Sequence, residues 1–439
     1  MNKNNIIYQL NLRTFTPDGT IKAAAAMLPH IKGLGVSVIY FAAFFESDDD
    51  PTEENWSPRQ KQSGIRNPKN PYRIKDYFKI DSEYGTDDDM LEFINKAHSY
   101  NLKVMFDLVY MHCGPSAVFL KDNPDFVLRD KKGNILTTEF NFPLINFGNQ
   151  KLRKYLIENM IYLVRKFDID GYRCDVGDNV PLDFWSSAAR EVKKIKPDFF
   201  MLNEGCNADY VKEVFDCNYH FDWSYDVNKV LRGNIPASDL IKLDMNTRKD
   251  YGKSGFKFLR SMDNHDIATN EHSSRIDKTL PRRAAECAHL LNFMLDGTPF
   301  LHNGNEIADG HELSMFDNRF YKGTNHINWA KALTEDGNSR MNFIRWLTSF
   351  RRENPSLQTA EVVWVENSLP DKLLTFTRKL DGKSLFVAIN MSDSDVLASA
   401  NAVIKNSVSE IKKRSAQYIE KSSEIKLSLG QWGFLILSY

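Results

Sequence analysis

Apolar and polar positions follow two different periods along this chain, and their alternation predicts strands followed by helices. Apolar residues run almost unbroken through residues 36–45 and 103–109, as expected for strands that are buried on both faces. In residues 151–167 the apolar positions instead recur every three or four residues, which is typical of a helix with one buried face. Repeated strand–helix units of this kind predict a parallel sheet covered by helices.

Eight strands, all but one followed by a predicted helix, can be traced as far as Asn354 and Pro355, where the last helix is expected to stop. The predicted strands are 6–12, 36–45, 103–109, a short strand ending at Asp175, 199–202, a strand near 221–225, 256–262 and 298–302. The predicted helices are 23–33, 90–100, 151–167, 182–196, 210–214, 282–295 and 341–352. Eight parallel strands alternating with helices predict an α/β fold, the (β/α)8 or TIM barrel.

Other segments interrupt or follow the barrel pattern. Residues 47–72 form a long polar connection, and residues 113–146 show no regular period and contain several prolines. We therefore expect a barrel over 1–112 and 147–354, with a small inserted domain over 113–146. In 355–439 the apolar positions alternate with period two, which predicts a C-terminal antiparallel β-sandwich domain.

Composition narrows the class of function. The 439 residues are 42% hydrophobic and 12% aromatic, which is ample for a large core. A formal net charge of −1 gives no basic excess, so nucleic acid is not an expected partner. No apolar run approaches the length of a membrane span, so no membrane segment is expected. The first residues, MNKNNIIYQL, lack the apolar core of a signal peptide, which leaves a cytoplasmic protein or a trimmed exported form.

Residues with catalytic chemistry stand where the predicted strands end. Asp107 and His112 follow the third strand, Arg173 and Asp175 end the fourth, Glu204 ends the fifth, and His265 and Asp266 follow the seventh. In a barrel the carboxyl ends of all the strands meet at one mouth, which is where catalytic residues collect. Any one of these residues could be an ordinary hydrogen-bonding group. Four strand ends with acids, imidazoles and an arginine that converge on one mouth predict an active site.

Two of these acids form the expected reactive pair. Asp175 and Glu204 end two neighbouring parallel strands, so their side chains are expected to face each other. Arg173 lies two residues before Asp175 on the same strand face, and its charge is expected to hold Asp175 ionised. Glu204 follows an apolar strand and is expected to keep its proton. A facing pair of one ionised and one protonated carboxyl is what glycoside cleavage requires.

These residues resemble the four short regions of the α-amylase family, glycoside hydrolase family 13. The regions are DLVYMH from Asp107 to His112, GYRCD from Gly171 to Asp175, Glu204, and DNHD from Asp263 to Asp266. Further matches at 72–77, 84–86 and 143–146 agree in order and spacing, and the resemblance spans Tyr8 to Glu306. As an ordered set the motifs are highly specific. The resemblance implies a TIM barrel with a small insertion and a C-terminal β domain, acting on an α-glucan.

The resemblance also implies a role for each matching residue. Asp175 would be the nucleophile, Glu204 the general acid/base, and Asp266 the residue that binds ring hydroxyls and stabilises the transition state. The residues Arg173, His112 and His265 would position the sugar, and Tyr72 would stack on it. The implied reaction is a double displacement with retention of configuration, which requires the two reacting carboxyls to lie about 5–5.5 Å apart.

The resemblance implies no required cofactor, and two departures concern the structural calcium of the family. The family usually has an asparagine calcium ligand just before the histidine of the first region, and this chain has Met111 there. A thioether is a poor ligand for a hard cation. After the nucleophile, the family's Lys-His is replaced by the run 176–179. Calcium therefore stays possible, but its usual site is doubtful, and the leaving-group contacts are expected to differ.

The leading hypothesis is a retaining α-glycoside hydrolase acting on α-glucans or maltooligosaccharides, with starch-type α-1,4 linkages. Alternatives within the family are an α-glucan transglycosylase and an α-1,6-glucosidase. An inactive glycan-binding relative is an alternative of another class, against which the complete set of acids argues. A metallohydrolase using Asp107, His112, His265 and Asp266 lacks the H-x-H motif expected on an early strand. The sequence leaves open endo or exo action, and hydrolysis or transfer.

Overall fold

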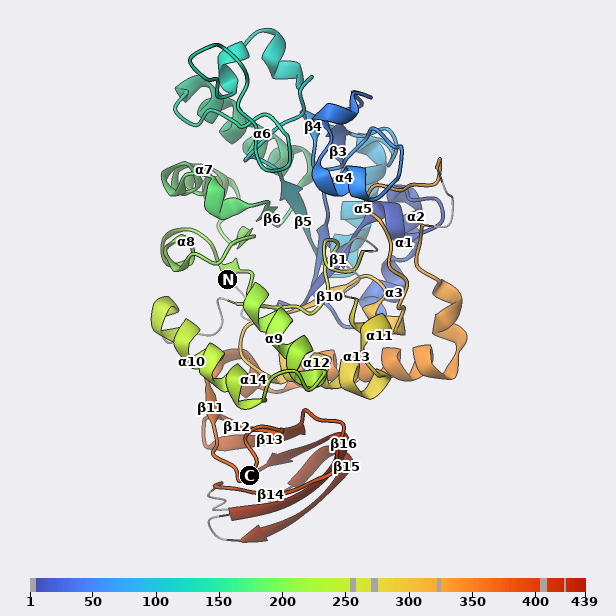
Figure 1. The fold of residues 1–439 in the computed structure, drawn as a ribbon, viewed down its shortest axis with the longest axis vertical. Helices are drawn as coiled ribbons and strands as arrows, with labels where there is room; N and C mark the ends of the chain where they lie inside the picture. The colour runs from blue at the N-terminus through green and yellow to red at the C-terminus, as the bar shows by residue number, and fades with distance from the viewer. Residues whose placement is uncertain (1–4, 253–257, 270–274, 322–324, 403–408, 422–423) are drawn as a thin grey trace.

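The computed structural model describes residues 5–252, 258–269, 275–321, 325–402, 409–421 and 424–439. A large α/β unit occupies the greater part of the molecule, and a β domain lies at one end of its long axis (Figure 1). The five cysteines are free thiols. None of the helices in the described residues is both long enough and apolar enough to cross a membrane.

Eight parallel strands form the centre of the large unit. They are β1 (Ile7–Leu10), β2 (Val38–Phe41), β5 (Lys103–Leu108), β6 (Gly171–Cys174), β7 (Phe200–Asn203), β8 (Cys217–Asn218), β9 (Leu259–Arg260) and β10 (Thr298–His302). Their order is β8-β7-β6-β5-β2-β1-β10-β9, and a parallel bridge between Asn218 and Phe258 links the two ends of the sheet. The predicted (β/α)8 barrel is confirmed.

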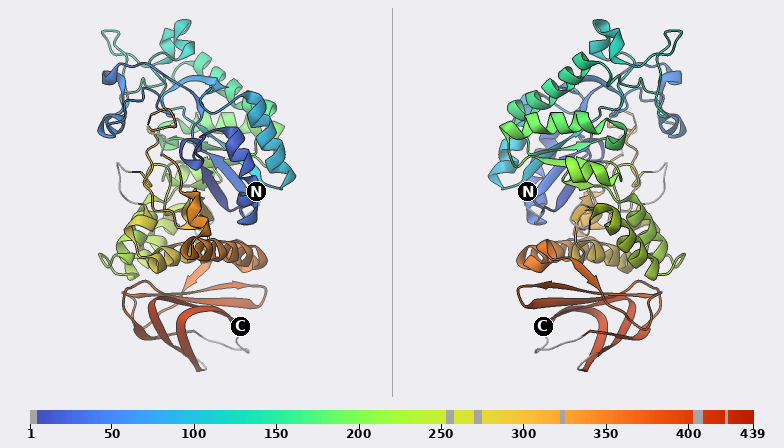
Figure 2. Two further views of the ribbon diagram at one scale, coloured as in Figure 1. Left: turned by 90° about the vertical axis from the view of Figure 1, so that its right-hand side faces the viewer. Right: turned by 90° about the vertical axis from the view of Figure 1, so that its left-hand side faces the viewer.

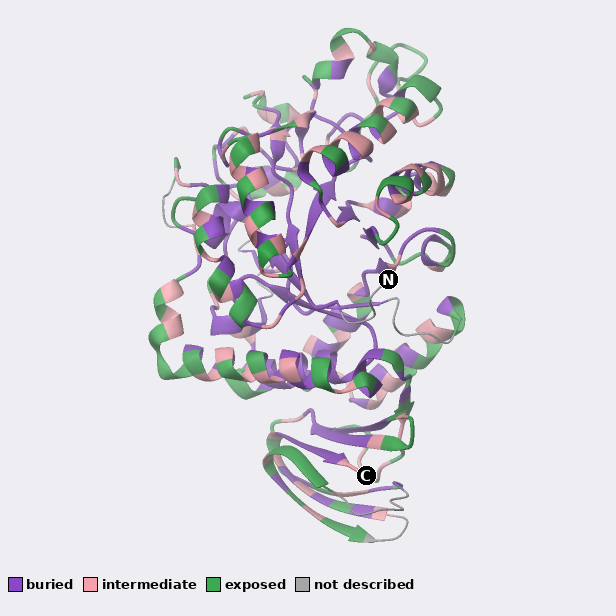
Figure 3. Ribbon diagram, turned by 180° about the vertical axis from the view of Figure 1, so that it is seen from behind, coloured by how far each residue is buried: buried purple, intermediate pink, exposed green. Residues whose placement is uncertain are grey.

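The strands are buried on both faces, as their continuous apolar runs predict. One core lies inside the barrel and includes Ile7, Val38, Met105, Leu202 and Phe300. A second and larger core lies between the strands and the surrounding helices. Figure 3 shows the strands as buried and the outer faces of the helices as exposed.

The helices surround the barrel and fill the connections between its strands. They are α1 (Leu12–Phe15), α2 (Ile21–Ala26), α3 (Leu28–Gly33), α5 (Asp87–Ser99), α6 (Gln150–Phe167), α7 (Leu182–Ile195), α8 (Ala208–Glu213), α9 (Phe221–Leu231), α10 (Ser238–Tyr251), α11 (Ile276–Thr279), α12 (Arg282–Met294), α13 (Glu335–Glu353) and α14 (Pro355–Thr359). Local signals set several boundaries. Thr86 and Asp89 form a capping box at the start of α5, and Asn149 caps α6.

Several predicted elements differ from the structure. The helix predicted over 23–33 is divided into α2 and α3 at Met27, just before Pro29. The sixth strand is the two-residue β8, not the stretch 221–225, which begins α9 because its apolar residues continue at helical spacing. The strand predicted over 36–45 ends at Phe41, because the chain leaves the barrel there.

Two connections rise from the mouth of the barrel. The β2 excursion, residues 45–80, contains β3 (Phe45–Ser47), α4 (Pro58–Gln62) and β4 (Ile74–Ile80), and β3 pairs antiparallel with β4. Its polar middle was predicted as a loop but also contains a short 3-10 helix, Glu53–Asn55. The second connection, residues 113–146, consists of turns, isolated bridges and two 3-10 helices, Val118–Lys121 and Pro124–Phe126.

The C-terminal domain is one antiparallel sheet of six strands. They are β11 (Val362–Trp364), β12 (Leu373–Leu380), β13 (Lys383–Asn390), β14 (Val396–Ala400), β15 (Ser409–Lys421) and β16 (Glu424–Ser438). The long β16 pairs with β13 through its last residues and with β14 through its first residues. The sheet therefore folds into two facing layers, as the side views show (Figure 2), around a core that includes Phe386, Leu427 and Leu435.

Candidate active site

The central carboxyl groups are placed by the pairing of three neighbouring strands. Asp107 on β5 lies beside Arg173 on β6, and Cys174 on β6 lies beside Asn203 on β7. The backbone pairing continues past the strand ends, because the N–H of Asp175 donates to Leu108 O (2.8 Å) and that of Glu204 donates to Cys174 O (3.0 Å). Asp175 and Glu204 therefore stand at the same level of the barrel mouth, as the sequence predicts.

A fully buried guanidinium joins three of these acids. Arg173 Nη1 contacts Asp107 Oδ1 at 2.8 Å and Asp175 Oδ1 at 2.7 Å, and its Nη2 contacts Glu204 Oε1 at 2.5 Å. The two candidate reactive carboxyls thus bind the two terminal nitrogens of one planar group, which fixes them next to each other. Glu204 Oε2 also accepts the backbone N–H of Val176 at 2.9 Å.

The protonation of this pair differs from the prediction. Burial raises the pKa of the Asp175 carboxyl well above its usual value; Arg173 lowers it, while Glu204 and Asp107 raise it. Burial also raises the pKa of Glu204, against the lowering effect of Arg173. Arg173 does lower the pKa of Asp175, as predicted, but burial and the neighbouring acids outweigh it, because one guanidinium is shared by three buried acids. The pair titrates as a unit and readily holds one proton.

Asp266 has the opposite electrostatic environment. Burial raises the pKa of its carboxyl, but His265, Arg59 and Arg173 together hold that pKa well below the usual range. Arg59 Nη1 lies 2.7 Å from Asp266 Oδ1, and His265 Nε2 lies 3.3 Å from Asp266 Oδ2. Asp266 is therefore ionised, and about a third of its side chain is exposed at the mouth of the barrel.

The protonation of His265 can be assigned from its neighbours. The side-chain oxygen of Gln9 accepts the backbone N–H of His265 (3.1 Å), so the amide nitrogen of Gln9 donates to His265 Nδ1 (2.7 Å). His265 then carries its proton on Nε2, which contacts Tyr72 Oη at 2.5 Å, and Tyr72 donates to Asp107 Oδ2 at 2.8 Å. Burial lowers the pKa of His265, against the raising effect of Asp266.

Tyr72 belongs to the β2 excursion, and His112 lies between the end of β5 and the second connection. The ring of Tyr72 stacks on that of His265, with centroids 5.2 Å apart and planes 17° apart. His112 Nε2–H donates to Tyr72 O at 2.9 Å, and burial lowers the pKa of His112 to about 4. His112 is therefore neutral, and its Nδ1 has no partner in the part of the chain that the structure describes. This nitrogen can accept a hydrogen bond.

Arg59 is the site residue that sequence analysis missed. It lies on α4 of the β2 excursion and reaches across the mouth to Asp266, which is 207 positions later in the chain. Its Nη2 donates to Asp266 O and to Thr269 Oγ1, both at 3.1 Å. A single arginine in a long polar loop has no local signal that predicts such a partner, so only the fold could reveal it.

All seven predicted site residues except the fully buried Arg173 line one cavity, of about 530 Å³. Asp175, Glu204 and Asp266 reach it together with Tyr72, His112 and His265. Aromatic residues from three segments supply much of the remaining wall, namely Phe140, Phe142, Phe221, Tyr225 and Phe316. Acids at the base of a cavity with aromatic walls suit a ring that carries many hydroxyl groups. The arrangement can protonate a leaving oxygen and supply a carboxylate nucleophile at the same carbon.

Comparisons with known proteins agree with this chemistry. The chain is 25% identical over 413 residues to a maltogenic alpha-amylase of Bacillus acidopullulyticus, covering 86% of this chain and 64% of that protein. It is 23% identical over 428 residues to a cyclomaltodextrinase of Thermoanaerobacter pseudethanolicus, covering 88% of this chain and 66% of that protein. This chain thus spans just under two thirds of the length of these relatives.

A solved structure has the same fold. It is that of a noncanonic maltogenic alpha-amylase, AmyB, from Thermotoga neapolitana, with a TM-score of 0.85 and 24% identity over 100% of this chain and 99% of that one. The family model for the alpha amylase catalytic domain matches residues 3–132 and 136–350. That match covers most of this chain and includes every candidate site residue described above, and the chain belongs to the alpha-amylase family.

Proposed function

We propose that the protein is a retaining α-glycoside hydrolase that acts on α-glucans or maltooligosaccharides. The observation that carries this proposal is the guanidinium of Arg173, which holds Asp175 and Glu204 side by side at the base of one cavity. A shared proton on this pair provides one carboxylate and one carboxylic acid, the two forms that a double displacement uses. Starch-type α-1,4 linkages are the proposed target, because the relatives are named maltogenic alpha-amylase and cyclomaltodextrinase.

In the first step, a carboxylate oxygen of Asp175 attacks the anomeric carbon and the bond from that carbon to the glycosidic oxygen breaks. Glu204 transfers its proton to the departing oxygen, and a covalent glycosyl-enzyme is left on Asp175. In the second step, Glu204 takes a proton from water, and the water oxygen displaces Asp175. Each step inverts the anomeric carbon, so the product keeps the α configuration.

Asp266 would act on the charge that develops on the sugar ring. Its carboxylate is ionised and partly exposed to the cavity, so it can accept hydrogen bonds from ring hydroxyls. Those hydroxyls become better donors as positive charge grows on the ring, and the interaction is therefore stronger in the transition state than in the ground state. Tyr72 and His265 line the same cavity, and their rings stack on each other, so they would position the sugar ring.

The experiment that tests this function is hydrolysis of maltoheptaose followed by proton NMR from the first minute. We expect the new reducing ends to appear as the α anomer and then to equilibrate towards the β anomer. First products in the β form would contradict the retaining mechanism. The absence of any new reducing ends from maltooligosaccharides, pullulan or cyclomaltodextrins would contradict the hydrolase proposal and favour a glycan-binding relative.

We propose further that activity needs no bound metal. The family's calcium-ligand position is Met111, which is buried in the main hydrophobic core and offers only a thioether. Among the described residues, no group of three or more His, Cys, Asp or Glu side chains is placed to hold a metal ion. The residues therefore do not fit the family's calcium site.

Exhaustive treatment with EDTA is thus expected to leave both activity and the melting temperature unchanged. The measurement is thermal unfolding and maltoheptaose hydrolysis before and after dialysis against the chelator. A calcium-dependent α-amylase treated in parallel serves as the control for metal removal. A fall in melting temperature that added calcium reverses would contradict the proposal.

A further inference from the structure

One side of the active-site cavity is closed by a wall built from two loops. The Asp266 wall consists of Arg59, Ile65 and Asn67 of the β2 excursion together with Met315 and Phe316 from the segment after β10. These segments emerge from β2 and β10, which flank β1 in the barrel. Glu204 and Tyr225 belong to the arc of β7 and β8, so the wall and the acid Glu204 stand on different sides of the mouth.

The residues behind the face of the Asp266 wall are buried and packed together. Ile65 is 4% exposed, Met315 4% and Phe316 1%, and they pack together as a small separate hydrophobic core with Tyr72 against it. The side-chain amide of Asn67 donates to Phe316 O at 2.9 Å, which joins the two loops directly. A sugar chain that entered the cavity could not continue through this side without unpacking that core.

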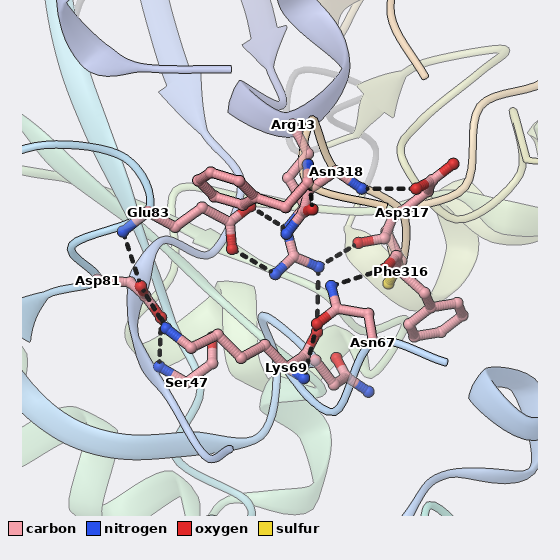
Figure 4. A network of polar contacts seen from close by, with 12 residues as sticks. Arg13, Ser47, Asn67, Lys69, Asp81, Glu83, Phe316, Asp317 and Asn318 are labelled. Carbon is pink, nitrogen blue, oxygen red and sulfur yellow. Dashed lines mark hydrogen bonds and ion pairs between the residues drawn. The ribbon is translucent and has the colours of Figure 1, made fainter. Parts of the chain in front are cut away.

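A buried arginine also fixes the same two loops (Figure 4). Arg13 Nη1 donates to Lys69 O at 3.1 Å in the β2 excursion and to Met315 O at 2.7 Å. Its other nitrogens bind Glu83 at 2.9 and 2.8 Å, so the guanidinium is held on both sides. An arginine that is 3% exposed and fully engaged makes the wall a rigid part of the fold.

Arg59 forms the face of the wall that meets the substrate cavity. Its guanidinium binds Asp266 and Thr269, and it lies over the ring of Phe316 at 5.7 Å from the ring centroid. The wall therefore begins directly beside the carboxylate that is proposed to bind the ring hydroxyls. On the Glu204 side the cavity instead ends at a residue open to solvent, because Tyr225 of α9 is 49% exposed.

The chemistry of the reaction indicates which end of the sugar chain lies on each side of the cavity. Glu204 protonates the oxygen that departs with the reducing-side fragment, so that fragment leaves along the open side. The sugar attached to Asp175 carries the non-reducing side of the chain and contacts Asp266, where the wall stands. Resting on the proposed function, we propose that the Asp266 wall, faced by Arg59, restricts cleavage to the non-reducing ends of α-glucan chains.

The test compares two substrates that differ only at the non-reducing end. They are 4-nitrophenyl maltoheptaoside and the same compound with its terminal 4- and 6-hydroxyls blocked by an ethylidene group. We expect the wild type to cleave the blocked substrate at least about 100-fold more slowly, since a packed wall leaves no room for the added group or for further sugars. Similar rates would overturn the inference while leaving the hydrolase function intact. No cleavage of either would overturn the proposed function, and this inference with it.

A set of arginine variants separates a specificity role from a merely structural one. Arg59→Ser shortens the face of the wall. It is expected to raise the ratio of the cleavage rate of the blocked substrate to that of the unblocked substrate about 10-fold, while Arg59→Lys keeps that ratio close to the wild-type value. Arg66→Ser is the matched control, because Arg66 belongs to the same excursion and 73% of its side chain is exposed. If Arg59→Ser lowers both rates equally and leaves the ratio unchanged, Arg59 has no role in specificity.

Discussion

Substituting asparagine for Asp175 is expected to lower kcat on maltoheptaose by roughly 10⁴-fold or more, because the substitution removes the nucleophile while keeping the side-chain shape. The amide oxygen of the introduced asparagine can still accept a hydrogen bond from Arg173, so the site should keep its geometry. Glu204→Gln is expected to cost roughly 10²–10⁴-fold, the usual contribution of a general acid/base. The measurement is initial-rate hydrolysis by both variants and the wild type from one preparation.

The same Asp175→Asn protein is expected to be at least as thermally stable as the wild type. Burial raises the pKa of this carboxyl well above its value in an unfolded chain, so its ionised form disfavours the folded state at neutral pH. Removing that charge should therefore raise the melting temperature or leave it unchanged. Loss of activity together with a clearly lower melting temperature would indicate a folding role for Asp175 and contradict the proposed one.

Replacing Arg173 by methionine is expected to lower the free energy of unfolding at pH 7 by about 3–5 kcal/mol. The side chain is fully buried, and its removal leaves Asp107, Asp175 and Glu204 packed together without their cation. The measurement is denaturant unfolding of the variant and the wild type at pH 7 and at pH 5. Activity should also be lost, because nothing then holds the two reacting carboxyls in register.

The decrease in the free energy of unfolding caused by Arg173→Met is expected to depend on pH in one direction. An acid whose pKa is higher in the folded protein than in the unfolded chain binds more protons when the protein is folded. As the pH rises from its unfolded-state pKa through its folded-state pKa, it therefore lowers the free energy of unfolding. The destabilisation caused by Arg173→Met should therefore be smaller at pH 5 than at pH 7. Arg351→Met is a suitable control, since Arg351 is equally buried but donates to the carbonyl oxygens of Phe293, Leu295 and Gly297. An equal pH dependence in both variants would contradict the explanation.

A local sequence pattern determines the structure around the two reacting acids. The continuous apolar run before Asp107 and the strand–helix–strand unit from Arg173 to Glu204 predict neighbouring parallel strands. Those strands place Asp175 and Glu204 at one level, as found. The eighth strand, 298–302, is also predicted at its observed bounds, because its apolar run is long enough to recognise.

Other features of the fold and of the site could not be predicted, because they depend on contacts between residues that are distant in the sequence. The sixth strand, β8, has only two residues, too few to show a period. Arg59 meets Asp266 across 207 positions, and Arg13 meets Met315 across 302, so neither pair has a signature in the sequence. The charge state of Asp175 was predicted from Arg173 alone. The structure adds two further acids and the burial of the whole cluster, and these reverse the direction of the pKa shift.

The central claim is that Asp175 forms a covalent bond to the sugar, and trapping that intermediate tests it most directly. A 5-fluoro-α-glucosyl fluoride should label the enzyme, because the fluorine next to the ring oxygen slows release of the glycosyl-enzyme more than its formation. After proteolysis and mass spectrometry, we predict that the added mass lies on the peptide containing Asp175, with the bond at that carboxyl. A label on Glu204, Asp266 or another residue, or an active enzyme that turns the reagent over without any label, would contradict the account.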